Sequence, residues 1–274
     1  MDAQRLSMTR PTARRQPRLV LVRANAPIFY STATASLLEA LAPESAGRLL
    51  EFFSDDAALC AWIRNEWLPG KNARFVELRR YLEDVWPEFD WSSARETHRA
   101  LVEQNGGSSP HRATAAREAL ARCVAAAQNG LFYRALACWS DDHRLRDLAR
   151  AIAREEAQSF ARFRRAFEQR AGAERVGLAA SWRTARACVR SARDTAVRLA
   201  FDAVALHCPA NAPFPIMDYS DLVPRVLAAV VHHASPRWFE RVLFRPWQRA
   251  PRTPRPAAQP PSATWFKPVL TQAA

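Results

Sequence analysis

The stretch that decides the fold is residues 141–170, which read DDHRLRDLARAIAREEAQSFARFRRAFEQR. Its large apolar residues recur at intervals of three and four, which is the spacing of one face of an α-helix. They are Leu145, Leu148, Ile152, Phe160, Phe163 and Phe167. Two Asp residues at the start favour a helix beginning there. A helix of this length is much longer than the average of about 11–12 residues, and long helices are typical of a bundle.

The same spacing continues through most of the chain. We expect helices over residues 54–85, 92–104, 111–139 and 173–207, followed by two shorter helices before Pro246. Pro69 and Gly70 should kink or loosen the helix over 54–85. Patterns typical of strands are absent, and the 274-residue chain has only 7 Gly residues. The sequence therefore predicts an all-α fold, a helical bundle with extra helices and flexible termini.

Charge and composition separate the two ends from the middle. The net charge is +13; residues 1–26 carry six Arg and one Asp, and residues 247–274 carry three Arg, one Lys and no acidic residue. We expect a basic N-terminal arm (1–26), one helical domain (27–246) and a Pro-rich C-terminal tail (247–274). No apolar run approaches the length of about 18–20 residues that a membrane span needs. The five Cys residues show no CxxC spacing, which favours a reducing compartment, here the cytoplasm.

Charged and polar residues interrupt the apolar faces of two predicted helices. Glu156 follows Ile152 by four residues, and Ser159 lies one turn further on, whereas Glu155 should point toward solvent. In the helix over 54–85, Lys71 lies between Trp67 and Phe75, and Arg74 follows on the same side. A single buried charge costs several kcal/mol, so such residues are usually paired, neutralised or functional, unless their side chains extend to solvent.

The order of several short motifs resembles the acyl-acyl-carrier-protein desaturases, which are ferritin-like di-iron proteins. The resemblance covers roughly residues 55–230. It rests on Trp67, Asn72, Leu78-Arg79-Arg80-Tyr81-Leu82, Gln128, Ile152-Ala153-Arg154-Glu155-Glu156 and Asp218-Tyr219-Ser220-Asp221-Leu222. It implies a ferritin-like bundle in which two Glu-x-x-His motifs and two single Glu residues hold two iron ions.

Most of the positions that hold iron in that family carry other residues here. The first Glu-x-x-His becomes Lys71 and Arg74, the single Glu of the next long helix becomes Asn129, and the second Glu-x-x-His becomes Glu156 and Ser159. Iron sites of this kind need carboxylate and imidazole donors. The resemblance therefore implies vacated metal-site positions at these five residues, and neither a metal nor a cofactor is expected.

The vacated site should still be organised by charge. Lys71 or Arg74 should reach Glu156, directly or through one water, because a carboxylate among apolar side chains needs a positive partner or a proton. Asn129 and Ser159 should satisfy the remaining hydrogen bonds. The nearest candidate for the remaining family Glu, on the first bundle helix, is Glu39, and the family's Thr near the irons corresponds to Phe132.

Three functions are consistent with these residues. The first is a desaturase-like protein that lacks the di-iron centre and binds an acyl chain or an acidic acyl carrier protein in a non-redox role. Such a protein could form a homodimer. The second is an active, iron-dependent acyl-carrier-protein desaturase-type oxidoreductase with unrecognised ligands. The third is a nucleic-acid-binding protein that uses the Arg-rich ends, for which no base-reading motif is visible. Whether the chain is an enzyme stays open at this stage.

Overall fold

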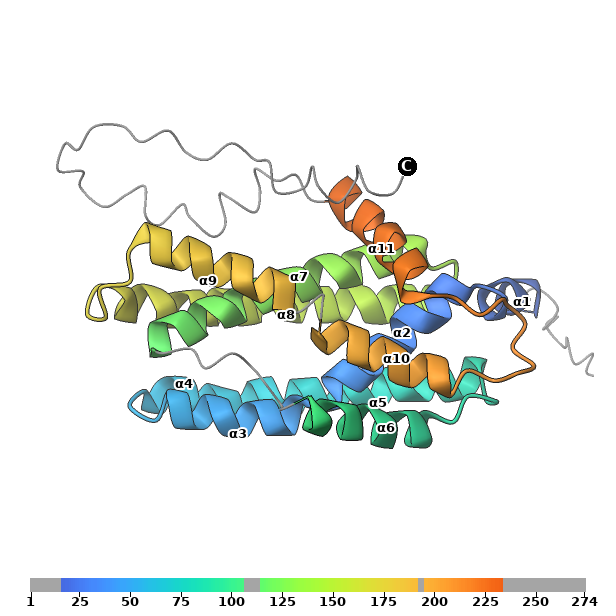
Figure 1. Cartoon of the computed structure of the whole chain (residues 1–274), viewed down its shortest axis with the longest axis horizontal. Coiled ribbons are helices and arrows are strands. Elements are labelled where there is room, and N and C mark those ends of the chain that lie inside the picture. Colours follow the sequence, from blue (N-terminus) through green and yellow to red (C-terminus); the bar gives the residue numbers. More distant parts are fainter. Residues whose placement is uncertain (1–15, 106–113, 192–194, 234–274) are drawn as a thin grey trace, which may run out of the picture.

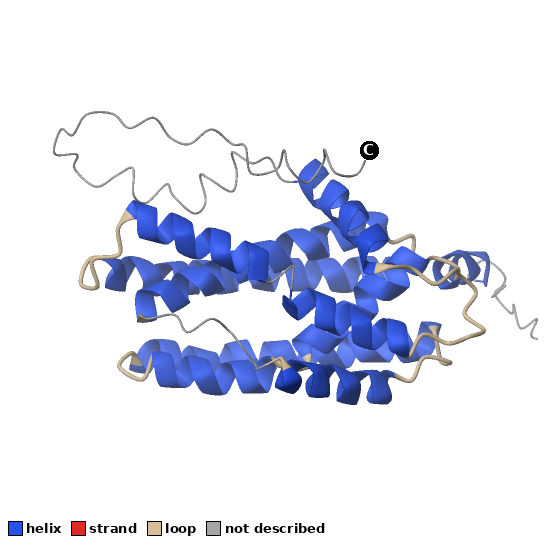
Figure 2. Ribbon diagram, in the orientation of Figure 1, coloured by secondary structure: helices blue, strands red, loops and turns tan. Residues whose placement is uncertain are grey.

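A computed structural model describes residues 16–105, 114–191 and 195–233. Within these residues every regular element is a helix and none is a strand (Figures 1 and 2), which confirms the predicted all-α class. The helices are α1 (Gln16–Arg23), α2 (Ala26–Glu39), α3 (Ala42–Phe52), α4 (Ala57–Trp62), a π-helical turn (Ile63–Trp67), α5 (Leu68–Val85), α6 (Trp91–Gln104), α7 (Ala115–Trp139), α8 (His143–Ala171), α9 (Leu178–Ser191), α10 (Val197–Leu206) and α11 (Tyr219–His233).

Short polar residues fix where several of these helices begin. The side chains of Asp56, Asp90, Thr114 and Asp142 each accept a hydrogen bond from a backbone N–H in the first turn of the following helix. Such N-caps satisfy donors that have no partner within the helix. The predicted helix starts near residues 54–56 and 140–142 are therefore confirmed.

The predicted loosening near Pro69 takes the form of the π-helical turn. The backbone N–H of Leu68 donates to the carbonyl oxygen of Ile63, five residues earlier, instead of the usual four. Pro69 follows at the start of α5, where its missing N–H does the least harm. The chain thus continues from α4 into α5 without leaving the helical path.

The helix predicted over residues 173–207 begins only at Leu178, and residues 192–194 within it lie outside the described residues. Arg175 takes a left-handed backbone conformation (φ 52°), and the N–H of Val176 donates to the carbonyl oxygen of Ala171, which ends α8 in a tight turn. The chain then forms α9, which packs against α7, and α10, which packs against α2 and α6. The backbone at Ala196, immediately before α10, is helical, so the described residues show no break that contradicts the rest of this predicted helix.

Other predicted segments fall partly outside the described residues. Of the two short helices expected before Pro246, α11 is present, and the remainder lies outside the described residues. So do residues 1–15 of the basic arm and the whole tail, 247–274. The described end of the arm is helical as α1; its Val22 is buried, and Arg23 forms an ion pair with Glu88 on the bundle.

Four long helices surround the centre of the molecule. α2 contacts α5, α5 contacts α8, α8 contacts α7, and α7 contacts α2, so that the four close a ring. α7 and α8 are joined by only three residues and therefore run antiparallel, side by side (Figure 1). No helix in the described part of the chain has the length and apolar character that would let it cross a membrane.

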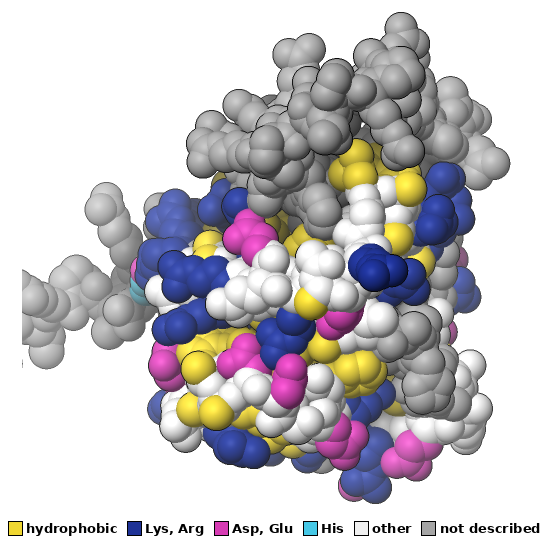
Figure 3. All heavy atoms as spheres, turned by 90° about the vertical axis from the view of Figure 1, so that its left-hand side faces the viewer, with side chains coloured by type: hydrophobic (Ala, Val, Ile, Leu, Met, Phe, Trp, Pro, Cys, Tyr) yellow, Lys and Arg dark blue, Asp and Glu magenta, His cyan; other side chains and the backbone are white. Residues whose placement is uncertain are grey.

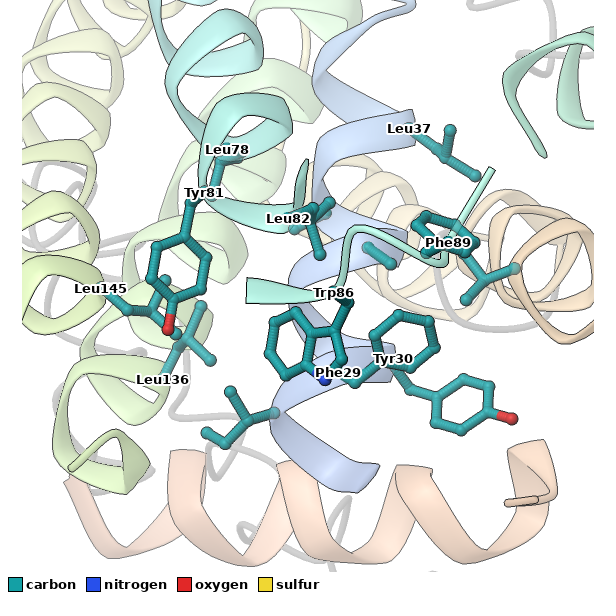
Figure 4. Packing of buried hydrophobic residues seen from close by; sticks show 14 of the residues in the cluster. Phe29, Tyr30, Leu37, Leu78, Tyr81, Leu82, Trp86, Phe89, Leu136 and Leu145 are labelled. Atoms are coloured by element: carbon teal, nitrogen blue, oxygen red, sulfur yellow. The ribbon is translucent and has the colours of Figure 1, made fainter. Parts of the chain in front are cut away.

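Within the described residues the apolar core forms two clusters. The first apolar cluster includes Phe29, Tyr30, Leu37, Leu78, Leu82, Trp86, Leu136, Leu145, Ile152 and Phe201. The second apolar cluster includes Leu49, Phe53, Leu59, Trp62, Ile63, Trp67, Leu120, Val124, Phe163 and Phe167. Figure 4 shows the first cluster, in which the rings of Phe29, Trp86 and Phe89 meet edge to face.

Candidate functional site: a buried ion-pair cluster

A group of charged and polar side chains lies where α2, α5, α7 and α8 meet. Along α5, it follows Trp67 of the second apolar cluster and precedes Leu78 of the first; along α8, it lies between Ile152 and Phe163. The two apolar clusters are thus separated by a polar layer. We call this group the polar cluster; its members are Glu39, Lys71, Arg74, Tyr133, Glu155 and Glu156.

Lys71 connects two carboxylates from different helices. Its Nζ donates to Oε1 of Glu156 on α8 at 2.7 Å. The same Nζ lies 2.9 Å from Oε2 of Glu39 on α2, an ionic contact whose angles are not those of a hydrogen bond. Lys71 is only 8% exposed, Glu39 5% and Glu156 2%. The ammonium group of Lys71, which extends from α5, therefore bridges the carboxylates of α2 and α8 in a position that is largely shielded from water.

Arg74, one turn further along α5, joins the adjacent carboxylates of α8. Its Nη1 donates to Oε1 of Glu156, and its Nε donates to Oε2 of Glu155 at 2.7 Å. The side chain of Glu155 is 46% exposed, so it lies at the edge of the cluster. Glu155 is thus partly solvated, as expected, but it also pairs with Arg74, because the guanidinium fork is wide enough to contact both neighbours.

Tyr133 on α7 completes the ring of four helices. Its hydroxyl donates to Oε1 of Glu39 at 3.0 Å, and the residue is 2% exposed. Burial raises the pKa of the Tyr133 phenol well above its usual value, and the nearby carboxylates of Glu39 and Glu156 raise it further. The hydroxyl therefore stays protonated and acts as a neutral donor toward Glu39.

The two cations remain charged despite their burial. Burial alone would lower the pKa of Lys71, but the carboxylates of Glu156 and Glu39 outweigh it and raise this pKa above its usual value. The pKa of Arg74 is raised for the same reason. Two buried cations thus balance the buried carboxylates of Glu39 and Glu156, which is how a charged group becomes tolerable in an apolar interior.

The structure brings together three of the five predicted site residues. The predicted contact between Glu156 and Lys71 or Arg74 is confirmed, and both cations take part. Ser159 is buried and Asn129 half-buried. Among the described residues, no hydrogen bond joins either of them to the polar cluster, so their expected role as partners is wrong. Tyr133, one turn beyond Asn129 on α7, takes that role.

Sequence reasoning missed Tyr133 and placed Glu39 only as the nearest candidate. Tyr133 follows Asn129 by four residues, so the two share one face of α7. A tyrosine on an interior helical face is usually part of the core, and only the carboxylate of Glu39 reveals its polar role. Glu39 is the last residue of α2, where the sequence shows no apolar pattern that would mark it as buried.

The donor set of the polar cluster does not suit an iron pair. Iron bound by carboxylates needs their oxygen atoms free, but here Lys71 and Arg74 both contact Oε1 of Glu156. Lys71 and Tyr133 contact the two oxygens of Glu39. No imidazole lies among the members. Across the described ranges, no three His, Cys, Asp or Glu side chains are grouped so that they could hold a metal ion.

Comparison with known proteins identifies no relative. No protein-family model, no curated protein and no solved structure matches this chain.

Proposed function

We propose that this chain is a metal-free, desaturase-like bundle protein with a ferritin-like fold, in which a buried ion-pair cluster stands where the di-iron desaturases that it resembles hold two irons. The observation that carries the proposal is the bridge from Glu39 through Lys71 to Glu156, since it joins three helices of the bundle with a side-chain cation. A divalent metal between carboxylates would meet repulsion from Lys71 and Arg74.

The proposed role is non-redox binding of an acyl chain or of an acidic acyl carrier protein in the cytoplasm. Iron-dependent oxidation would need ligands that the polar cluster does not offer. Arginines on the bundle surface or in the N-terminal arm would attract the carrier protein, and the net charge of +13 favours such an encounter. The five cysteines, all within the described residues, form no disulfide, which suits a reducing compartment.

Iron analysis tests the metal-free part of the proposal. Protein purified from iron-rich medium should carry well under one iron per chain, measured by elemental analysis beside a known di-iron bundle protein prepared in the same way. Close to two irons per chain, with a di-iron Mössbauer signature, would instead establish the active oxidoreductase.

A binding assay tests the partner. A purified acyl carrier protein should be retained by the immobilised chain at low salt and released as salt rises, because exposed charges are screened within about 8–10 Å at physiological ionic strength. Retention that is equal at low and high salt, or no retention at low salt, would count against this part of the proposal. The iron result would stand independently.

A further inference from the structure

The outward face of α9 is a row of arginines. α9 lies on the outer side of the layer formed by α7 and α8 (Figure 1). Its Ala185 and Cys188 are buried against the bundle, whereas Arg183, Arg186 and Arg190 are exposed on the other side. Their spacing of three and four residues places these three side chains along one helical face.

In the part of the chain that the structure describes, this row forms no ion pair with an acidic residue. From residue 175 to residue 191 the chain has four arginines and neither Asp nor Glu. Among the described residues, no carboxylate forms an ion pair with any of these four. Several arginines elsewhere are paired, for example Arg170 with Asp55 and Asp56. The end of the molecule seen in Figure 3 likewise shows basic and acidic side chains together.

The dimensions of the row match a nucleic-acid strand. With a rise of about 1.5 Å per residue, Arg183 to Arg190 extend over about 10 Å of helix. Each strand of double-stranded DNA carries one phosphate per about 3.4 Å of axis, so the row faces about three phosphates. A guanidinium group can also donate two parallel hydrogen bonds to one phosphate.

The same face suits other partners less well. Protein interfaces depend on a few large apolar or aromatic anchors, whereas the outer face of α9 offers only Leu178, at its first residue, as an exposed large apolar side chain. Binding flat on a membrane would need the apolar side of α9, which is packed against α7. Contacts to phosphates need charge alone and carry no sequence information.

We propose that α9 binds the phosphate backbone of double-stranded DNA, without reading its sequence, through Arg183, Arg186 and Arg190. This surface differs from the terminal segments considered in the sequence analysis, and it does not involve the polar cluster. The expected affinity is that of non-specific binding and falls steeply with salt.

Fluorescence anisotropy with a labelled 20-base-pair duplex of mixed sequence tests the proposal on the full chain. The variant Arg183→Ala/Arg186→Ala/Arg190→Ala should bind at least ten-fold more weakly at 50 mM salt. Its plot of log K against log salt should be shallower by about 2.7, since each phosphate contact contributes about 0.9. A second duplex of different sequence should give the same affinities.

A matched variant removes the same number of positive charges elsewhere. Arg79→Ala/Arg99→Ala/Arg164→Ala replaces three arginines that are each paired within their own helix. This matched variant should change the slope of log K against log salt by less than one and the affinity for the duplex by less than three-fold. Both variants keep the terminal arginines, so the comparison isolates α9. Circular dichroism verifies folding, and the corresponding Gln substitutions replace Ala if the helical signal falls.

Three results would overturn the proposal. The first is that the wild-type chain does not bind the duplex at 50 mM salt. The second is that the two triple variants lose affinity for the duplex equally. The third is that the α9 variant loses binding to polyglutamate while its binding to the duplex is unchanged. The last result would assign α9 to an acidic protein partner.

Discussion

At the scale of single residues, the polar cluster shows how much the cost of a buried charge depends on its partners. Glu156 is 2% exposed and is contacted by both Lys71 and Arg74. Each of these groups would be unfavourable if left alone in the apolar interior. Removing one partner therefore costs more than the pair contributes, because the remaining charges keep their burial and lose their compensation.

Substitution of Glu156 should be much more destabilising than substitution of its neighbour. Glu156→Ala leaves two buried cations short of a carboxylate and should lower the free energy of unfolding by about 3–5 kcal/mol. Glu155→Ala removes a half-exposed ion pair and should cost at most about 1 kcal/mol. Urea denaturation of the two variants and the wild type measures both values. Similar losses in the two variants would show that Glu156 is not the centre of the cluster.

His98 on α6 should make the fold sensitive to mild acid. It is 1% exposed, and burial lowers its pKa from 6.5 to about 4. Between these values the unfolded chain binds a proton that the folded chain does not, so stability falls as pH falls. One pKa unit corresponds to about 1.4 kcal/mol, so the loss between pH 7 and pH 4.5 should be roughly 2 to 3 kcal/mol.

Denaturation of the wild type and His98→Gln at pH 7 and pH 4.5 measures this contribution. The carboxylates titrate in both proteins, so the difference between their pH dependences belongs to His98. The variant should lose less stability on acidification than the wild type. Identical pH dependences would mean that His98 can take up a proton in the folded chain.

At the scale of helices, the pair α7 and α8 is held together by close packing as well as by charge. Gly130 is in the middle of α7, and a Cβ placed there would lie 3.6 Å from Cβ of Glu156 and 3.8 Å from the carbonyl oxygen of Ala153. These are ordinary van der Waals separations. A methyl group would therefore fit at this position between the helices.

Gly130 should therefore tolerate Ala and reject Leu. Gly130→Ala should stabilise the protein by about 0.5–1 kcal/mol, since Ala has the higher helix propensity and its methyl group fits. Gly130→Leu should force α7 and α8 apart at Glu156 and destabilise the protein by about 1–3 kcal/mol. Thermal unfolding of both variants provides the measurement. A destabilised Ala variant would indicate a closer approach of the two helices.

At the scale of the whole molecule, a polar layer divides one bundle into two apolar clusters. Three continuous helical segments nevertheless belong to both clusters. The segment from α4 to α5 contributes Ile63 to the second apolar cluster and Leu78 to the first. In the same way, α8 contributes Phe163 to the second cluster and Ile152 to the first, and the two ends of α7 each contribute residues to one of the clusters. Neither cluster can separate from the bundle while these helices stay intact.

The chain should therefore unfold in one cooperative transition. Far-ultraviolet circular dichroism reports the helices. The fluorescence of the nine tryptophans includes Trp62 and Trp67 in one cluster and Trp86 and Trp91 in the other. The two signals should change at the same denaturant concentration. To separate the clusters, the variants Trp62→Phe/Trp67→Phe and Trp86→Phe/Trp91→Phe can be compared. Different midpoints for the two clusters in these variants would contradict a single cooperative unit.

The periodicity of the sequence was sufficient for the long helices and for part of the site. The N-caps at Asp56 and Asp142 and the three-and-four spacing of α8 are local properties, so they can be read without the fold. The same spacing places Glu156, Lys71 and Arg74 on interior faces. Local sequence alone did not reveal the left-handed turn at Arg175, which moves the start of the following helix from the predicted residue 173 to Leu178.

The sequence by itself determined that this protein is helical and that buried charges on α5 and α8 need one another. Only the tertiary structure decided which partners complete the cluster. Glu39 and Tyr133 lie 94 positions apart in the chain, yet their side chains meet at 3.0 Å because α2 and α7 are neighbours in the ring of helices. A local pattern reports which face of a helix is interior; which residue lies opposite depends on how the helices pack.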